Sequence, residues 1–269
     1  MNSEIKGFIS IFLVLSFIMF FGIHAFAQGY EGKEGVSSKE GQGKEVVLYV
    51  TRHGKTILNT TDRVQGWIDS PLTEAGVEVA EYLGKGLRGI PFVAAYSSDS
   101  GRAVETAEIA LEQSNQTGLE IIKTKNLREI YFGKYEGELN HKMVADIAEE
   151  YKLPRDTDQL KVFNRKFSEL VDTIAKLDET KQAEDWEQVG TRIKSELDNI
   201  SKTVAEKGGG NVLIVAHGLT INGILSTIQP DYLTGYLDNA SITKIIYRDG
   251  KYTIESINDM GYVERGKNK

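Results

Sequence analysis

Two arginines and two histidines stand at or just beyond the ends of apolar stretches of the sequence. Arg52 and His53 follow the apolar residues 46–50, and His217 directly follows a second apolar run. Arg102 stands a few residues beyond a third. Short apolar runs are typical of buried strands, and ligands of open α/β sheets bind at the carboxyl ends of the strands. We therefore expect these four side chains to gather at one edge of a sheet.

These residue types suit the transfer of a phosphoryl group. Each arginine offers a rigid fork of donors that can hold the oxygens of a tetrahedral dianion, and Arg102 lies near an expected helix N-terminus, which also favours phosphate. The neutral imidazole of His53 is a competent nucleophile near neutral pH and can carry a covalent intermediate. A second histidine, His217, could stabilise charge on the transferring group.

The leaving alkoxide of such a reaction needs a proton, and Glu129 is the candidate donor. It follows the apolar residues 119–122, which predict a short strand. A carboxyl group can act as a general acid near neutral pH when burial raises its pKa. Asp99 and Glu105 are nearby acids that compete for this role.

Strands and helices alternate along most of the chain. The strands are expected at residues 45–50, 92–97, 119–122, 212–216, 242–247 and 252–257, the last two forming a hairpin. Helices are expected after Thr73 and Ser100, and two or three more between residues 142 and 207. The pattern predicts an α/β three-layer sandwich, in which a mostly parallel central sheet has helices on both faces and a helical insertion at residues 142–182.

The first part of the chain has the layout of an export signal. Residues 8–23 are apolar and uncharged, and the Ala-x-Ala pattern that ends at Ala27 suits signal peptidase. We expect residues 1–27 to be a cleaved signal peptide and the mature protein to be secreted, without stable membrane contact. The alternative is a membrane anchor formed by the uncleaved signal. Residues 28–44 are rich in glycine, serine and alternating charges, which predicts a flexible linker before a single domain at residues 45–269.

Composition excludes several classes of protein. The formal net charge is −7, and an acidic chain is poorly suited to nucleic acid, whose phosphate backbone needs a basic face. The chain has no cysteine, which excludes disulfides, thiol nucleophiles and cysteine zinc sites.

The candidate residues lie in motifs that occur together in a known family. These motifs are Thr51-Arg52-His53-Gly54 with Asn59, Arg63, Gln65-Gly66 and Asp69-Ser70-Pro71-Leu72-Thr73, then Ser97-Ser98-Asp99 with Arg102, Leu127-Arg128-Glu129-Ile130, and Val215-Ala216-His217-Gly218. In this order the chain resembles the histidine phosphatase superfamily, also called phosphoglycerate-mutase-like, from Val46 to the closing hairpin. Lys55 stands where the family often has glutamate.

The resemblance implies a role for each of five side chains. His53 would take the phosphoryl group. Arg52, Arg102 and His217 would form the phosphate pocket. Glu129 would act as general acid and then help to activate water.

The resemblance also implies the surroundings of these side chains. Asn59 would add a phosphate contact, and the loop of Gln65 and Gly66 would line the mouth of the site. No metal and no other cofactor is implied, because arginines and histidines carry the charge stabilisation that magnesium supplies elsewhere. The remaining histidine of the domain, His141, is expected to be solvated beside a helix start.

The family includes both phosphatases and mutases. Its glycolytic mutases carry a paired-arginine segment after the glutamate motif, and no adjacent arginines occur here between Glu129 and His217. We therefore expect metal-independent hydrolysis of a small phosphomonoester, with phosphoglycerate-mutase-type transfer as the alternative. A second alternative is a catalytically inactive surface module that binds a phospho-ligand. The presence of all five expected side chains disfavours that alternative.

Overall fold

The computed structural model describes residues 44–269. The predicted signal peptide, its cleavage after Ala27 and nearly all of the predicted linker lie outside the described residues. Within them, no helix combines the length and the apolar character needed to cross a membrane.

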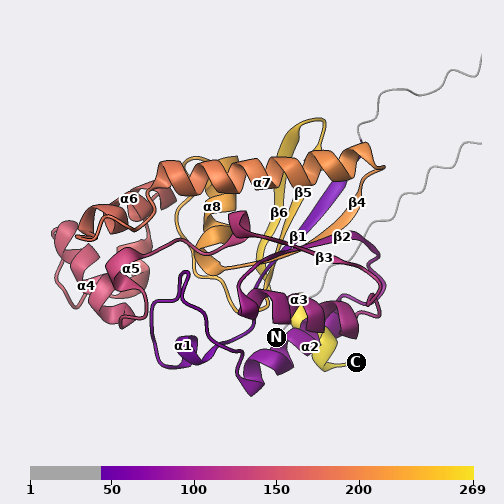
Figure 1. Cartoon of the computed structure of the whole chain (residues 1–269), viewed down its shortest axis with the longest axis horizontal. Helices are drawn as coiled ribbons and strands as arrows, with labels where there is room; N and C mark the ends of the chain where they lie inside the picture. Colours follow the sequence, from indigo (N-terminus) through magenta and orange to yellow (C-terminus); the bar gives the residue numbers. More distant parts are fainter. Residues whose placement is uncertain (1–43) are drawn as a thin grey trace, which may run out of the picture. The chain divides into compact units, whose positions relative to one another are not determined.

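A six-stranded sheet forms the centre of the described part of the chain, with the strand order β3-β2-β4-β1-β5-β6 (Figure 1). Strands β1 to β4 run parallel to one another, and β5 and β6 add an antiparallel hairpin at one edge. The strands are β1 (Val46–Arg52), β2 (Phe92–Ser98), β3 (Ile121–Thr124), β4 (Gly210–Ala216), β5 (Ile242–Arg248) and β6 (Lys251–Asp259). The predicted mostly parallel sheet is confirmed.

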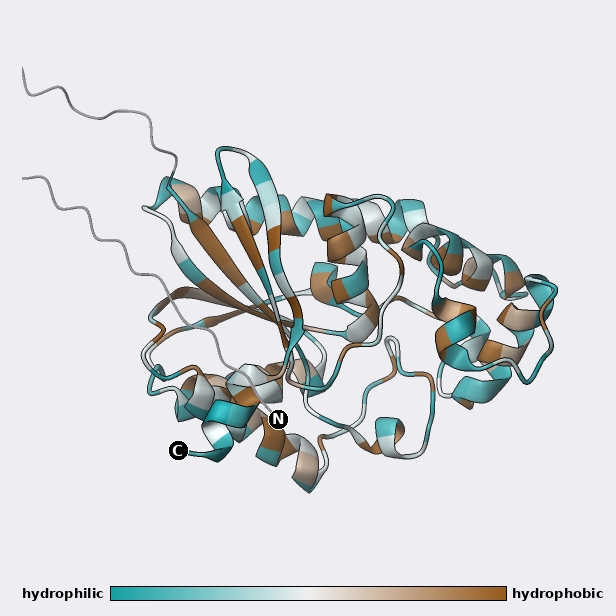
Figure 2. Ribbon diagram, turned by 180° about the vertical axis from the view of Figure 1, so that it is seen from behind, coloured by the Kyte–Doolittle hydropathy of each residue, from teal (hydrophilic) through white to brown (hydrophobic). Residues whose placement is uncertain are grey.

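Strand β4 shows why helices must cover both faces of the sheet. Its residues Val212 and Ile214 join the core on one face, and Leu213 and Val215 join the core on the other; all four are fully buried. The first face packs against α7 (Trp186–Glu206) and α8 (Gly218–Ile228), and the second against α2 (Glu74–Gly86), α3 (Gly101–Gln113) and α9 (Gly261–Lys267). Figure 2 shows the apolar strands between these layers. The predicted three-layer sandwich is confirmed.

The helical insertion contains α4 (Asn140–Glu150), α5 (Gln159–Phe163) and α6 (Phe167–Leu177), which lie together beyond one end of α7 (Figure 1). Their buried residues, among them Met143, Val162 and Phe167, extend the core on the α7 side. With α7, residues 142–207 therefore carry four helices rather than the two or three expected. Helix α5 has only five residues, which is too short for a helical period to show in the sequence.

Two other details differ from the expectations. Strand β3 begins at Ile121 and ends at Thr124, two residues later than the predicted strand at 119–122, because its bounds follow its pairing with β2 along the sheet edge. The short helices α1 (Ile57–Thr60) and α9 were not foreseen. Helix α9 is defined by its close packing on α2, a contact between residues far apart in the sequence.

The α2–α9 contact predicts a steric effect on stability. A Cβ atom at Gly266 would collide with the carbonyl oxygen of Tyr82, so Gly266→Ala must push the two helices apart. We expect this substitution to lower the free energy of unfolding by about 1–3 kcal/mol in urea denaturation. Gly118→Ala is the matched control, because a Cβ atom there meets open space. Equal stability of the two variants would contradict this packing.

Candidate active site

The predicted site residues meet where three parallel strands end. Arg52 is the last residue of β1, and the backbone N–H of His53 donates to the carbonyl of Ala216 at the end of β4 (3.0 Å). His217 follows β4 directly, and Arg102 lies in the first turn of α3, just after β2. The rings of His53 and His217 stand edge to face with centroids 5.2 Å apart. Residues separated by up to 165 positions are therefore neighbours, as predicted.

The hydrogen bonding of His53 prepares one ring nitrogen for attack. Its Nδ1 lies 2.7 Å from the carbonyl oxygen of Gly54, so Nδ1 carries the proton and donates it there. The Nε2 atom then keeps a free lone pair. Burial and the positive charges of Arg102 and Arg52 hold the pKa of His53 well below its usual range. The imidazole is thus neutral at physiological pH, which is the nucleophilic form.

Several buried polar atoms of the site have no partner among the described residues. They are the Nε donors of Arg52 and Arg102 and the two ring nitrogens of His217, of which one is a donor and one an acceptor in the neutral imidazole. A buried polar atom without a partner is costly, and one that carries charge more so. Burial and the charge of Arg102 hold the pKa of His217 well below its usual range, with smaller contributions from His53 and two other arginines. A tetrahedral oxyanion would satisfy these donors and compensate their charge.

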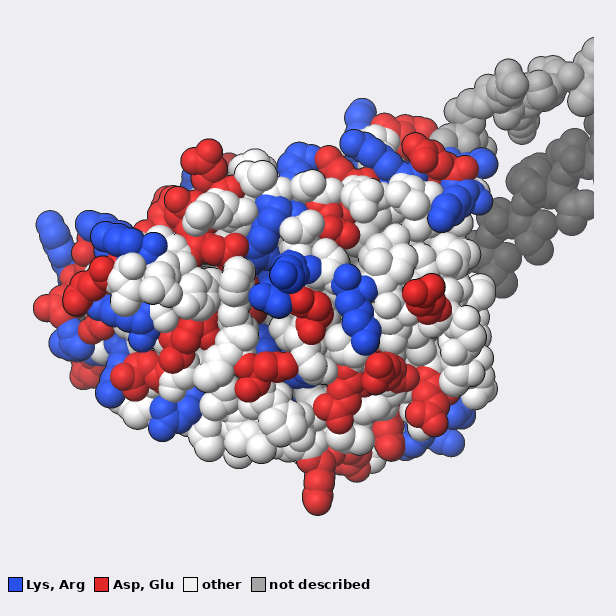
Figure 3. Space-filling model, in the orientation of Figure 1, with Lys and Arg blue, Asp and Glu red and all other residues white. Residues whose placement is uncertain are grey.

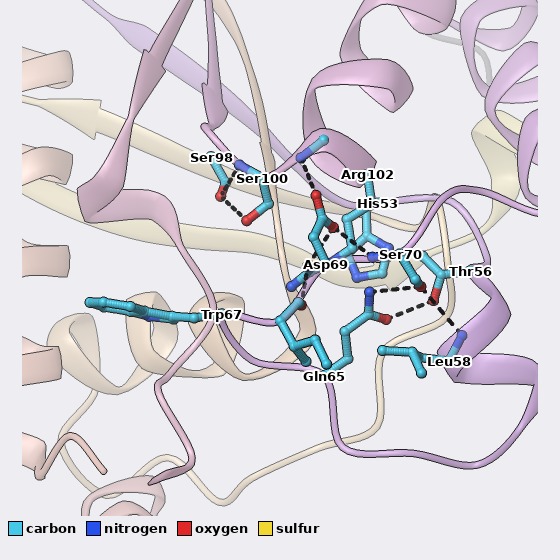
Figure 4. A network of polar contacts seen from close by, with 12 residues as sticks. His53, Thr56, Leu58, Gln65, Trp67, Asp69, Ser70, Ser98, Ser100 and Arg102 are labelled. Atoms are coloured by element: carbon cyan, nitrogen blue, oxygen red, sulfur yellow. Dashed lines mark hydrogen bonds and ion pairs between the residues drawn. The ribbon is translucent and has the colours of Figure 1, made fainter. Parts of the chain in front are cut away.

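Arg102 is held rigidly by a loop from another part of the chain (Figure 4). Its Nη1 donates to the carbonyl of Ile68 (3.1 Å) and to Asp69 Oδ1 (2.8 Å), and its Nη2 donates to the carbonyl of Gly66 (2.8 Å). The second carboxylate oxygen of Asp69 accepts from the backbone N–H of Gly101 (2.5 Å). Both N–H groups of Nη1 and one of Nη2 are therefore engaged, and the Nε donor remains available to a ligand.

Glu129 is buried against the N-terminus of α8. Its carboxylate oxygens accept from the backbone N–H groups of Leu219 (3.0 Å), Thr220 (2.8 Å) and Ile130 (3.0 Å). Burial raises the pKa of Glu129, although the N–H donors of Leu219 and Ile130 and the charge of Arg102 oppose the rise. This direction is the one that a general acid requires.

The two competing acids lie elsewhere. Asp99 forms a bidentate ion pair with Arg128 (2.6 and 2.7 Å), and this bond lowers the pKa of Asp99. Glu105 lies on α3. Neither of these carboxylates lines the cavity that contains His53 and Glu129.

That cavity has a volume of ≈ 180 Å³. Arg52, His53, Asn59, Gln65 and Glu129 all contribute to its wall, whereas Arg102 and His217 are buried and do not. A larger groove of ≈ 560 Å³ beside α7 and α8 contains none of these side chains. Five of the residues chosen from the sequence therefore line the smaller cavity.

The loop of Gln65 and Gly66 is only partly as predicted. Gln65 lines the cavity, but its amide is engaged with Thr56 Oγ1 (2.6 Å) and Ser70 Oγ (3.2 Å), as Figure 4 shows. Gly66 does not contribute to the cavity wall. Its carbonyl instead binds Arg102, and a Cβ atom there would collide with the side chain of Glu136. Close packing under the loop explains this glycine.

His141 is exposed on α4, as expected, and outside the cavity. Other residues around the site were not singled out. Glu136 accepts from the backbone N–H groups of Trp67 and Ile68 (both 3.0 Å) and fixes the loop that holds Arg102. The side chain of Asn239 donates to the carbonyl of His53 (2.8 Å). Glu136 belongs to the pair Glu136-Gly137, which is itself one of the motifs of the family resemblance but suggested no role, whereas no local pattern marks Asn239.

Comparison with known proteins agrees with this geometry. The model of the histidine phosphatase superfamily (branch 1) matches residues 48–260. The chain belongs to this superfamily.

Its relatives differ in their named activities. A solved structure named phosphoglycerate mutase, from Bacillus anthracis str. Sterne, is 50% identical, covers 84% of this chain and 98% of its own, and has a TM-score of 0.79. A metal-independent phosphoserine phosphatase of Arabidopsis thaliana is 32% identical over 84% of this chain and 89% of its own. A 2,3-bisphosphoglycerate-dependent phosphoglycerate mutase of Lactobacillus johnsonii is 30% identical over 72% of this chain and 84% of its own. All three names denote enzymes that act on phosphate esters.

The buried neutral imidazole of His53 predicts acid sensitivity of the fold. The pKa of His53 is lowered in the folded state. Below the ordinary pKa of histidine, the unfolded chain therefore binds a proton that the folded chain does not, and the free energy of unfolding decreases as the pH is lowered. Between about pH 7.5 and about pH 5.5, His53 should contribute a loss of up to about 1.4 kcal/mol in the free energy of unfolding. Urea denaturation at both pH values should show a smaller loss for His53→Gln. An equal loss in both proteins would argue against a neutral His53.

Proposed function

We propose that this protein hydrolyses phosphomonoesters through a covalent phosphohistidine on His53. The observation that carries the proposal is the hydrogen bond from His53 Nδ1 to Gly54, which leaves Nε2 unprotonated beside Arg52, Arg102 and His217. Arginine N–H groups and the imidazole N–H of His217 around this atom suit the non-bridging oxygens of a phosphoryl group.

The reaction proceeds in two displacements. The lone pair of His53 Nε2 attacks phosphorus while the bond to the ester oxygen breaks, and protonated Glu129 gives its proton to that oxygen. Water then attacks the phosphohistidine as Glu129 takes one of its protons, and the P–N bond breaks to release phosphate. Because Arg52, Arg102 and His217 stabilise the charge of the transferring group, we propose that no metal ion is needed.

Hydrolysis is favoured over mutase action by the surroundings of the phosphate pocket. A phosphoglycerate mutase must also hold the carboxylate of its substrate. Besides Arg52, the only cationic side chain that lines the cavity in the described chain is Arg63, and its Nη1 already donates to the carbonyl of Gly137 (2.7 Å). The gathering of all five predicted side chains at one edge favours an active enzyme over an inactive binding module.

We propose that the protein is exported and acts on small molecules outside the cell, with the signal peptide cut after Ala27. The mass of the mature N-terminus tests the cleavage. The net charge of −7, with cationic and anionic side chains interspersed over the face drawn in Figure 3, supports a function that does not involve nucleic acid.

Replacing the nucleophile should abolish turnover. His53→Ala removes the atom that forms the P–N bond, so we expect kcat/KM for p-nitrophenyl phosphate, assayed in EDTA, to fall by at least about 10³-fold. Brief reaction with a radiolabelled ester should leave acid-labile label on the wild type and none on the variant. His141→Ala is the control and should keep full activity. Metal-free turnover by His53→Ala at the wild-type rate would refute the mechanism.

We further propose that the alcohol part of the substrate is uncharged and apolar. Beyond the phosphate pocket, the cavity wall includes Phe132, Met143 of α4, and Leu160 and Phe163 of α5, beside the polar side chains of Asn140 and Gln159. Leu160 is 63% exposed, which places an apolar side chain at the cavity where it meets solvent. A volume of ≈ 180 Å³ is below the roughly 300–1,000 Å³ of drug-sized pockets, so the ester should be small.

A charge introduced on this wall should change substrate preference. Leu160→Asp places a carboxylate beside an apolar alcohol, so we expect the kcat/KM ratio of 1-naphthyl phosphate to O-phosphoserine to fall by about tenfold. Leu233→Asp is the matched control, because Leu233 is 50% exposed and does not line the cavity. The kcat/KM ratio of each variant is measured with the same assay of released phosphate. An unchanged ratio in Leu160→Asp would contradict the proposed apolar subsite.

A further inference from the structure

The segment that carries Glu129 has little regular structure of its own. It follows the short 3₁₀ helix η1 (Lys125–Leu127), and residues 128–132 belong to no helix or strand. No sheet ladder therefore fixes the position of the Glu129 backbone. The contacts that do so must come from other parts of the chain.

One side chain of α7 supplies three of these contacts. Arg192 Nη1 donates to the carbonyl oxygens of Asn126 and Arg128 (both 2.9 Å), and Nη2 donates to the carbonyl oxygen of Glu129 (3.1 Å). Trp67 Nε1 adds a second donor to that last carbonyl (3.0 Å). Arg192 thus binds three carbonyls within four consecutive residues.

Arg192 is itself fixed by Glu184. Its Nε and Nη2 donate to the two carboxylate oxygens of Glu184 (2.7 and 2.8 Å), and both side chains are only 13% exposed. Glu184 also continues the contact along the segment: its carboxylate accepts from the N–H of Tyr131, and its own N–H donates to the Tyr131 carbonyl (both 3.0 Å). We call this pair the Arg192–Glu184 clamp.

The clamp uses every donor that an arginine has. A guanidinium carries five N–H groups in a rigid planar fork, and here Nε makes one hydrogen bond while Nη1 and Nη2 make two each. Lysine, with three donors around one atom, cannot reproduce this arrangement.

We propose that Arg192 is a positioning residue for the general acid, and that Glu184 orients Arg192. The inference rests on the proposed function. The N-terminus of α8 holds the carboxylate of Glu129, and the clamp holds its backbone. Together they set where the carboxyl proton stands when the ester oxygen leaves phosphorus and takes that proton. Because proton transfer needs short, aligned geometry, a shifted backbone weakens it while the phosphate pocket stays in place.

The dependence on the leaving group separates this role from a merely structural one. A good leaving group such as p-nitrophenolate departs without a proton, whereas an alkoxide requires one. In Arg192→Met, kcat/KM should therefore fall by about 10–100-fold for n-butyl phosphate and by only a few-fold for p-nitrophenyl phosphate. The value of kcat/KM reports the steps up to departure of the alcohol, so slow hydrolysis of the phosphohistidine does not disturb the comparison.

Further variants make the experiment decisive. Glu129→Gln should show the same leaving-group dependence, and adding Arg192→Met to it should change the ratio no further. Arg155→Met is the matched control: Arg155 also binds two carboxylates, Asp146 and Glu149, but lies on the surface away from this segment, so both rates should stay at the wild-type level. Arg192→Lys serves if the methionine variant does not fold, and it should show the same selective loss.

The possible outcomes are distinct. Equal losses on both esters, or an unchanged ratio in a folded Arg192→Lys, would overturn the positioning role. A wild type that hydrolyses neither ester would overturn the proposed function itself. Selective loss on n-butyl phosphate, with the affinity for inorganic phosphate unchanged, supports the clamp.

Discussion

The structure depends on burying positive charge beside uncharged imidazoles at one edge of the sheet. Arg102 is 1% exposed, and its charge, with that of Arg52, acts on both His53 and His217. Burial, together with this concentration of cationic donors, keeps the imidazoles neutral, which a nucleophile requires. The same donors make the edge attractive to a dianion. The same arrangement is unfavourable for the folded chain alone, because buried donors without partners cost stability. Binding a tetrahedral anion would relieve that cost.

Such a site must be supported by residues that never touch a ligand. The carboxylate of Asp69 and two backbone oxygens near it, those of Gly66 and Ile68, accept from Arg102, and Glu136 fixes the loop that provides them. Arg192 and Glu184 do the equivalent for the segment of Glu129. In each case a largely buried arginine, paired with a carboxylate, fixes backbone that has no sheet or helix ladder. The irregular loops at the sheet edge therefore hold their side chains in defined places.

Relatives with different named activities, two mutases and a phosphatase, match the chain along most of its length. The difference between such activities must lie in what surrounds the phosphate pocket. Here the surroundings come from α4 and α5, whose residues Met143, Leu160 and Phe163 bring apolar surface to the cavity. This part of the chain carried no recognisable motif, which is why the substrate was the least predictable feature.

The sequence by itself determined the fold class and most of the site. His53 and His217 stand just past apolar runs, and Arg102 a few residues past another, so the carboxyl ends of parallel strands had to bring them together. The tautomer of His53, the raised pKa of Glu129 and the bracing by Arg192 were decided only by the tertiary structure. The tautomer depends on backbone geometry, the raised pKa on burial, and the bracing on hydrogen bonds between residues far apart in the chain. The spacing of residues in the sequence shows none of these. Helix α9 was missed for the same reason. Its seven residues are too few to form a stable helix alone, and they are stabilised by packing on α2.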